Sequence, residues 1–206
     1  MTPPPWTLRG HGLVALYAPA PGSLLGALML LRYASSPVGP YDELLWVEAP
    51  TPSPAGPRLQ VRSIFVSTRE SMVWGRRNWG LPKRLAGFEW EGEPGRGQVR
   101  VTGEDGRAVA HLACQWSGPR LPVTTALLPA PLRTLAQPAL DGGEGWLLTT
   151  PRATGHVSPA RLTVLHADGL HPPLVSARPR LTLGVPDFRL VFPEPERAQK
   201  SRPLGR

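Results

Sequence analysis

Lys83 is the residue of this sequence best suited to covalent chemistry. The chain has only two lysines, Lys83 and Lys200, and meets its other needs for a fixed positive charge with arginine. Arginine serves a surface charge as well as lysine does, but only lysine can lose its proton and become a nucleophile. A lysine amine attacks a ketone to form an iminium, and a carboxylate β to that carbon can then leave as carbon dioxide. This chemistry predicts no cofactor and no metal ion.

A nucleophilic lysine needs surroundings that favour its uncharged form. An ordinary lysine has a pKa of about 10.4 and is almost fully charged at neutral pH, and burial among apolar side chains is what disfavours the charge. We expect Trp79, Leu81 and Leu85 to bury Lys83. Arg84 is a candidate substrate-binding cation, although adjacent side chains in an extended chain point to opposite faces. The open alternative is a solvated turn lysine beside Pro82.

Three further residues are candidates for the same site. In an extended segment Tyr41, Glu43 and Leu45 share one face, so a strand that buries Leu45 also buries Glu43. Glu43 could then orient substrate, stabilise positive charge or move protons, and Tyr41 is a candidate substrate-binding residue. Arg9 could bind a substrate carboxylate through its planar guanidinium. The alternatives are an exposed strand glutamate and a surface salt bridge of Arg9.

Short strands are expected to position these residues. Prolines interrupt any long helix, and apolar runs are bounded by Pro, Gly or Asp, which is typical of an all-β protein. One short helix is expected from Ser67 or Thr68, as N-cap, to Gly80. Asp105-Gly106 is expected to form the turn of a tight hairpin. The predicted strands are 13–17, 25–34, 43–48, 59–67, 86–91, 98–102, 108–116, 146–149, 161–166, 180–183 and 188–192.

Composition narrows the class of protein. The 206 residues carry a formal charge of +8 and a single cysteine, Cys114, which excludes an internal disulfide framework. The arginines are spread along the chain without a nucleic-acid-binding motif, so we expect no nucleic-acid partner. No apolar run is long enough for a membrane helix, and the N-terminus lacks the pattern of a signal peptide. We expect a cytoplasmic protein with one domain, 1–193, and a flexible basic tail, 194–206.

Three short motifs, in this order, resemble those of the acetoacetate decarboxylase family. Members carry a Pro-Tyr-x-Glu or Tyr-x-Glu segment, then a helix ending in Gly-Arg-Glu, then a Pro-Lys-Lys or Pro-Lys-Arg turn. The matching pieces are Pro40-Tyr41-Asp42-Glu43, Gly75-Arg76-Arg77 and Pro82-Lys83-Arg84. The resemblance implies a mostly β fold, an antiparallel cone-like β-barrel with one or two short helices, in which the lysine reacts. It also implies a homo-oligomer and a small keto acid as the partner molecule.

One departure from the family bears on the reaction. Decarboxylases of the family carry another glutamate on the strand before Tyr-x-Glu, and the matching stretch here, "LLGALMLLRYASS", has no carboxylate. Our hypothesis is a Schiff-base lyase acting on a small keto acid, with Lys83 and Glu43 as catalytic residues and an altered reaction or substrate as one possibility. The alternative is a barrel of the same fold that binds a small ligand without turnover.

Overall fold

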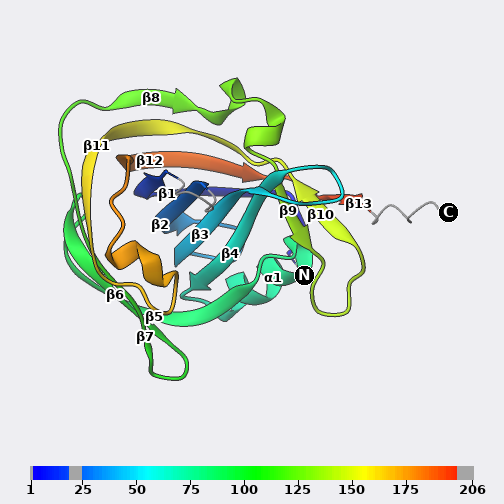
Figure 1. Cartoon of the computed structure of the whole chain (residues 1–206), viewed down its shortest axis with the longest axis horizontal. Coiled ribbons are helices and arrows are strands. Elements are labelled where there is room, and N and C mark those ends of the chain that lie inside the picture. The colour runs from blue at the N-terminus through cyan, green and yellow to red at the C-terminus, as the bar shows by residue number, and fades with distance from the viewer. Residues whose placement is uncertain (1, 19–24, 199–206) are drawn as a thin grey trace.

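A computed structural model describes residues 2–18 and 25–198 of the chain. These residues form thirteen β-strands, one α-helix and three short 3₁₀ helices (Figure 1). The strands are β1 (Trp6–Tyr17), β2 (Leu25–Ser35), β3 (Tyr41–Thr51), β4 (Arg58–Val66), β5 (Lys83–Glu93), β6 (Arg96–Gly103), β7 (Ala108–Trp116), β8 (Leu121–Thr124), β9 (Leu135–Pro138), β10 (Trp146–Thr149), β11 (Arg152–His166), β12 (Leu181–Phe192) and β13 (Glu196–Ala198). The helices are α1 (Arg69–Trp79), η1 (Thr125–Leu127), η2 (Ala130–Leu132) and η3 (Pro172–Val175).

Nine of the strands are hydrogen-bonded into a closed ring. The order around it is β4, β3, β2, β1, β12, β11, β7, β6 and β5, and β5 pairs again with β4. Strands β9, β10 and β13 extend the sheet beyond β4, and β8 pairs with β11 outside the ring. Figure 1 shows the ring strands β5, β6 and β7 on one side of strands β1 to β4 and helix α1 on the other.

The expectation of an antiparallel sheet is corrected at two places. Strand β4 pairs in parallel with β5, from Ile64↔Lys83 to Val66↔Leu85, and in parallel with β9. Parallel neighbours need a crossover connection, usually a helix, and α1 is the connection between β4 and β5. The helix therefore closes the ring and places Lys83 at the first position of β5.

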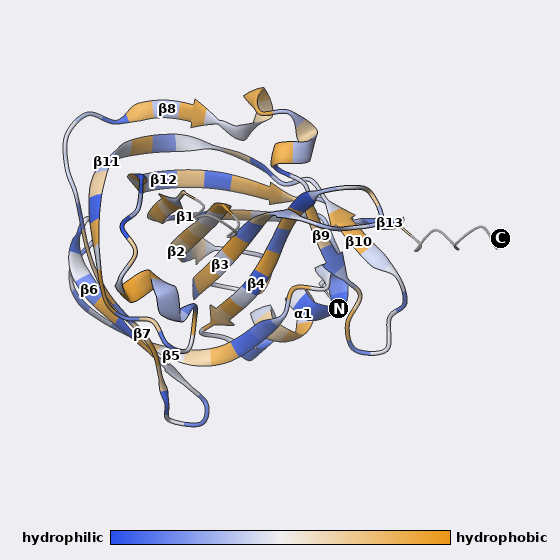
Figure 2. Ribbon diagram, in the orientation of Figure 1, coloured by the Kyte–Doolittle hydropathy of each residue, from blue (hydrophilic) through white to orange (hydrophobic). Residues whose placement is uncertain are grey.

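Strands β1 to β4 are buried on both faces. One face packs inside the ring, where Leu13, Leu44 and Phe65 belong to the larger apolar cluster. The opposite face carries Leu8 and Val66, which belong to a second cluster that includes Trp79 of α1. The alternation of apolar and polar residues along the strands is visible in Figure 2, but apolar residues here occupy both faces.

Helix α1 has the caps expected from the sequence. The Thr68 side chain accepts a hydrogen bond from the backbone N–H of Ser71, and Gly80 ends the helix in the left-handed conformation with φ 65°. Ser71, Gly75 and Trp79 are its buried residues, as expected for positions four residues apart on one helical face. The predicted helix is confirmed.

The predicted strands correspond to observed ones, usually with longer bounds. The segments 108–116 and 146–149 match β7 and β10, whereas 180–183 and 188–192 are parts of one strand, β12. Strands β8, β9 and β13 were not predicted from the sequence. In the hairpin between β6 and β7 only Gly106 of the expected pair has a positive φ, 76°.

The expected tail is corrected at its beginning. Glu196–Ala198 form β13, which pairs with β10, and 199–206 lie outside the described residues. Within the part of the chain that the structure describes, no helix is long and apolar enough to span a membrane. Oligomerisation and a cytoplasmic location stay predictions.

The end of α1 gives a prediction on stability. A Cβ on Gly80 would lie 2.3 Å from the Pro138 carbonyl oxygen, whereas one on Gly106, also left-handed, would meet nothing within 4 Å. Gly106→Ala should lower the free energy of unfolding by about 1 kcal/mol, the cost of a left-handed alanine. Gly80→Ala should lower it by about 3 kcal/mol, because steric overlap adds to that cost. Denaturant titration measures both, and equal losses would show that α1 tolerates a shift at its C-terminus.

Candidate active site

Lys83 and Glu43 form a buried ion pair. Lys83 Nζ lies 2.8 Å from Glu43 Oε2, and the two residues are 3% and 5% exposed. Lys83 pairs with Ile64 of β4, and Glu43 of β3 pairs with Val66 of the same strand. Both side chains belong to the sheet face that packs against α1, since Ile64 and Val66 lie in the cluster shared with that helix. The two predicted catalytic residues are therefore in direct contact.

Helix α1 shapes the other side of the lysine. Lys83 Nζ donates a hydrogen bond to Ser71 Oγ at 3.0 Å. A Cβ on Gly75 would lie 2.5 Å from Lys83 Cδ and 2.7 Å from Cε. Glycine inside a helix costs about 1 kcal/mol relative to alanine. The extended lysine side chain occupies the space that a larger residue at Gly75 would need.

Two tyrosines complete the polar cluster. Tyr33 of β2 donates from its hydroxyl to Glu43 Oε1 at 3.0 Å. Lys83 Nζ lies 5.1 Å from the centroid of the Tyr41 ring, and the Tyr33 and Tyr41 centroids are 4.6 Å apart. Each Glu43 oxygen thus has a partner, one the ammonium and the other a phenol.

Burial keeps both tyrosines protonated. The pKa of Tyr33 is raised well above its ordinary value by burial and then by the negative charge of Glu43. Burial followed by the Glu43 charge also raises the pKa of Tyr41, against the opposing effect of hydrogen bonds with Ser71 and Tyr33. At neutral pH the cluster therefore contains phenol donors beside one lysine and one carboxylate.

This arrangement can move protons in a space closed to bulk water. Glu43 is within hydrogen-bond distance of Lys83 Nζ and can accept a proton from the ammonium, which leaves a free amine. Tyr33 holds a proton at the other Glu43 oxygen. Breaking such a pair inside a protein is costly because it leaves an uncompensated charge, so the two groups stay within the distance needed for proton transfer.

The structure does not place the two candidate arginines beside Lys83. Arg84 is exposed on the opposite face of β5, with its guanidinium 4.2 Å from the Phe65 ring centroid and 3.5 Å from the Gly169 carbonyl oxygen. Arg9 is exposed on β1 and pairs across the sheet with Arg189. Of the residues expected to bury the lysine, Trp79 and Leu81 are themselves buried, and Leu85 is half-buried.

Tyr33, Ser71 and Gly75 were not identified as site residues from the sequence. The hairpin between β2 and β3 would have indicated Tyr33, because a turn at 36–40 places Tyr33 opposite Tyr41. Helical spacing would have indicated the other two, since Ser71 and Gly75 are four residues apart on the buried face. The contact between this face of α1 and Lys83 depends on the pairing of β4 with β5, which the sequence does not show.

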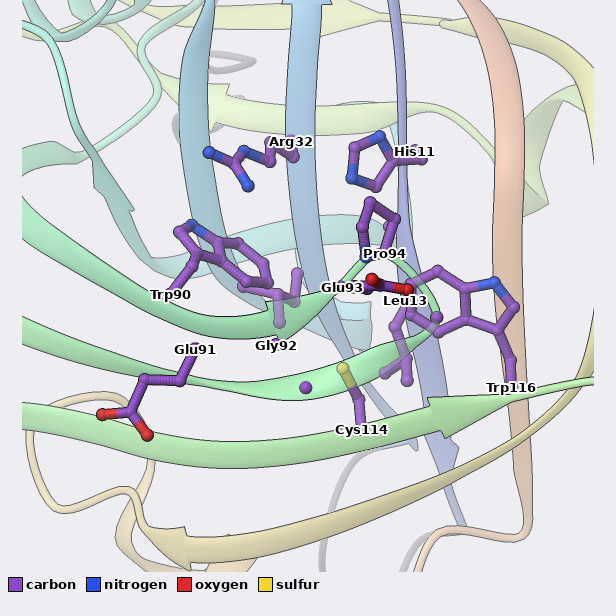
Figure 3. Close-up of a pocket in the computed structure, with 14 residues that line it drawn as sticks. His11, Leu13, Arg32, Trp90, Glu91, Gly92, Glu93, Pro94, Cys114 and Trp116 are labelled. Atoms are coloured by element: carbon purple, nitrogen blue, oxygen red, sulfur yellow. The ribbon is translucent and has the colours of Figure 1, made fainter.

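A small cavity lies on the other face of the same sheet. His11 and Arg32 lie at one side of it (Figure 3). Its walls are Trp90 of β5, the turn between β5 and β6, and Trp116 of β7. Its volume of about 20 Å³ is close to that of one water. Among the described residues no group of three or more His, Cys, Asp or Glu side chains is arranged to hold a metal ion.

Comparison with solved structures identifies the fold. The chain superposes on the enduracididine biosynthesis enzyme MppR complexed with pyruvate with a TM-score of 0.65 and 16% identity, over 98% of this chain and 93% of that one. Acetoacetate decarboxylase from Legionella pneumophila gives 0.62 and 16%, over 97% and 89%. An acetoacetate decarboxylase-like enzyme from Sphingomonas wittichii gives 0.63 and 12%, over 95% and 93%. The chain has the fold of acetoacetate decarboxylase-like proteins, which confirms the resemblance at the level of the fold.

Comparison with known sequences gives weaker evidence of relatedness than comparison with solved structures. No family model matches the chain. The rice (Oryza sativa subsp. japonica) protein NEOXANTHIN-DEFICIENT 1 is 29% identical over 102 residues, which is 41% of this chain and 34% of the rice protein. The matched stretch thus spans about a third of that relative.

The three tyrosines predict how stability depends on pH. Folding raises the pKa of Tyr33 and Tyr41, and it raises that of Tyr17 to about 12 through burial. Above about pH 10 the unfolded chain releases phenol protons that the folded protein keeps, so the free energy of unfolding falls as pH rises. Tyrosinate absorbance should appear only together with unfolding, and Tyr33→Phe should reduce the alkaline loss. A tyrosine that ionises near pH 10 in the folded protein would contradict this burial.

Proposed function

We propose that the protein is a Schiff-base enzyme in which Lys83 forms an iminium with a small keto acid. The observation that carries the proposal is the 2.8 Å contact between Lys83 Nζ and Glu43 Oε2, both buried, beside the hydroxyl of Ser71. The fold alone does not imply a function. The proposal rests on the presence, within this fold, of the sole lysine of the described residues at a site that excludes water.

The contacts support a sequence of proton transfers. Glu43 accepts a proton from the Lys83 ammonium, and the free amine attacks the carbonyl carbon of the substrate. Glu43 returns this proton to the substrate oxygen and then transfers to it a second proton from the attacking nitrogen, so that the oxygen leaves as water when the iminium forms. In a β-keto acid the carboxylate then leaves as carbon dioxide and its bonding electrons form an enamine. Glu43, which accepts a hydrogen bond from Tyr33, takes up a proton from water and delivers it to the enamine, which becomes an iminium again before hydrolysis.

Strand β2 favours a reaction other than efficient acetoacetate decarboxylation. Leu31 lies directly opposite Glu43, and Met29 lies opposite Leu45, so apolar groups line the wall where decarboxylases of this family carry a further glutamate. MppR has been solved with pyruvate and with the condensation product of pyruvate and imidazole 4-carboxaldehyde. We infer that α-keto acids and aldol-type condensation or dehydration are alternatives to decarboxylation, with acetoacetate a poor substrate.

A barrel-like carrier that binds a ligand without turnover is the second candidate. It is favoured by the filled interior of the ring, where Leu44 and Leu112 are fully buried. It is also favoured by the 2.8 Å contact of Lys83 Nζ with Glu43 Oε2, which occupies the amine. The two candidates differ in whether a covalent adduct forms at Lys83.

Borohydride trapping decides between these candidates. Reduction in the presence of pyruvate, acetoacetate or a longer keto acid should add to Lys83 the mass of the substrate less water plus the two hydrogens of the reduction, as read by peptide mass spectrometry. Lys83→Arg should abolish the adduct while keeping the positive charge, because a guanidinium does not form an iminium. A label that persists in Lys83→Arg would assign the reaction to Lys200 or the N-terminal amine and refute the site.

A pair of glycine variants tests whether lysine placement matters in the same assay. Gly75→Ala introduces a methyl group at 2.5 Å from Lys83 Cδ, whereas on Gly87 of the same strand as Lys83 the nearest atom is 3.9 Å away. Misplacement of a reacting group by about 1 Å can cost up to a hundredfold in rate. Gly75→Ala should therefore slow adduct formation by about tenfold or more and Gly87→Ala should not. Equal rates would show that the observed lysine position is not needed for reaction.

A further inference from the structure

Two arginines face each other on adjacent strands at the face opposite the Lys83 site. Arg9 of β1 is the direct cross-strand partner of Arg189 of β12, and both are exposed. Directly opposed residues have Cβ atoms about 4.5–5.5 Å apart, and like charges so placed are destabilising. Alternate residues of β1 point the other way, where Trp6 and Leu8 are buried. The arginines thus repel each other without being required for packing.

Neither guanidinium is compensated by another described side chain. Among the described residues, Arg9 and Arg189 make no ion pair and no side-chain hydrogen bond. The acidic group nearest in sequence on that face is Asp187, whose carboxylate is 3.0 Å from His156 Nδ1. Arg152 adds a further exposed cation, since it pairs with Val191, two residues beyond Arg189.

Hydroxyl groups continue the row on both sides. Ser35 of β2 pairs with Arg9, and Thr154 of β11 pairs with Arg189. Thr124 of β8 pairs in turn with Thr154. Strands are spaced about 4.8 Å apart, so the row presents two guanidinium groups between hydroxyl donors at even intervals. We name these five residues (Ser35, Arg9, Arg189, Thr154 and Thr124) the arginine row.

We propose that the arginine row is a binding site for an oxyanion ligand, either a phosphate ester or a small polycarboxylate. A guanidinium binds such groups through two parallel hydrogen bonds, and one anion between Arg9 and Arg189 removes their repulsion. The five residues of the row do not line the cavity beside His11 and Arg32 (Figure 3), so the anion binds on the exposed surface of the row. The site is separate from the proposed Schiff-base site and does not depend on it.

Calorimetric titration at low ionic strength tests this site with two probes, inorganic phosphate and citrate. We expect saturable binding of at least one probe to the full chain, and the tighter probe identifies the phosphoryl or the carboxylate class. Arg9→Gln and Arg189→Gln should each weaken binding by about tenfold or more, because each removes a charge-assisted bidentate contact. Arg178→Gln is the matched control, since Arg178 is exposed in the loop before β12, and it should bind as the unmodified protein does.

Thermal unfolding supplies a second readout that a purely structural role would not give. Without anion, Arg189→Gln should unfold at the same temperature as the unmodified protein or a higher one, because a repulsion is removed. At a probe concentration that saturates the unmodified protein, Arg189→Gln should unfold at a lower temperature than the unmodified protein does. A bound ligand stabilises the protein only to the extent that it binds. Lys83→Arg should bind each probe as the unmodified protein does, which separates this test from the proposed function. Absence of saturable binding, or equal weakening by Arg178→Gln, would overturn the proposal.

Discussion

The structure depends on one buried ion pair, Lys83 with Glu43. Taking two charges out of water is costly, and attraction between them compensates only when the geometry is good and their other hydrogen bonds are made. Here the remaining partners are Ser71 on the ammonium and Tyr33 on the carboxylate. Each of these four residues lies on a different element, namely β5, β3, α1 and β2. The pair therefore requires the sheet to be formed and the helix to be packed on it before either charge is satisfied.

The two faces of strands β1 to β4 have different roles because of this pair. One face packs into the ring and is filled with apolar side chains, and the other carries the titratable cluster beneath α1. A parallel connection through α1 brings Lys83 beside β4. Gly75 has no side chain and so leaves space for the Lys83 side chain against the helix. Chemistry at Lys83 is thereby isolated from the small cavity and the arginine row on the other face. The fold matches acetoacetate decarboxylase-like structures over almost the whole chain, although its identity to them is too low to carry function.

The capping residues and the alternation of apolar residues in the sequence predicted those elements that depend only on residues close together in the chain. Thr68 and Gly80 set the ends of α1, and the alternation from Ala108 to Trp116 set β7. Strands β9 and β13 were missed because each is very short and lies in a proline-rich stretch. Glu43 and Lys83 were found from a motif, and the alternation of an extended chain indicated that Arg84 points away from Lys83. Arg9 could not be placed, because the face on which its side chain lies depends on pairing between distant strands. The parallel contact of β4 with β5 has no local signature.

A double-mutant cycle on Lys83 and Glu43 measures the central interaction directly. Lys83→Met and Glu43→Gln each leave one buried group without its partner, so each should lower the free energy of unfolding by about 3–5 kcal/mol. The double variant leaves no uncompensated charge and should cost much less than the sum of the two, with a coupling free energy of about 2 kcal/mol or more. Denaturant titration of the four proteins at neutral pH gives this value. Additive losses would mean that the two side chains do not interact, and would contradict the account of this site.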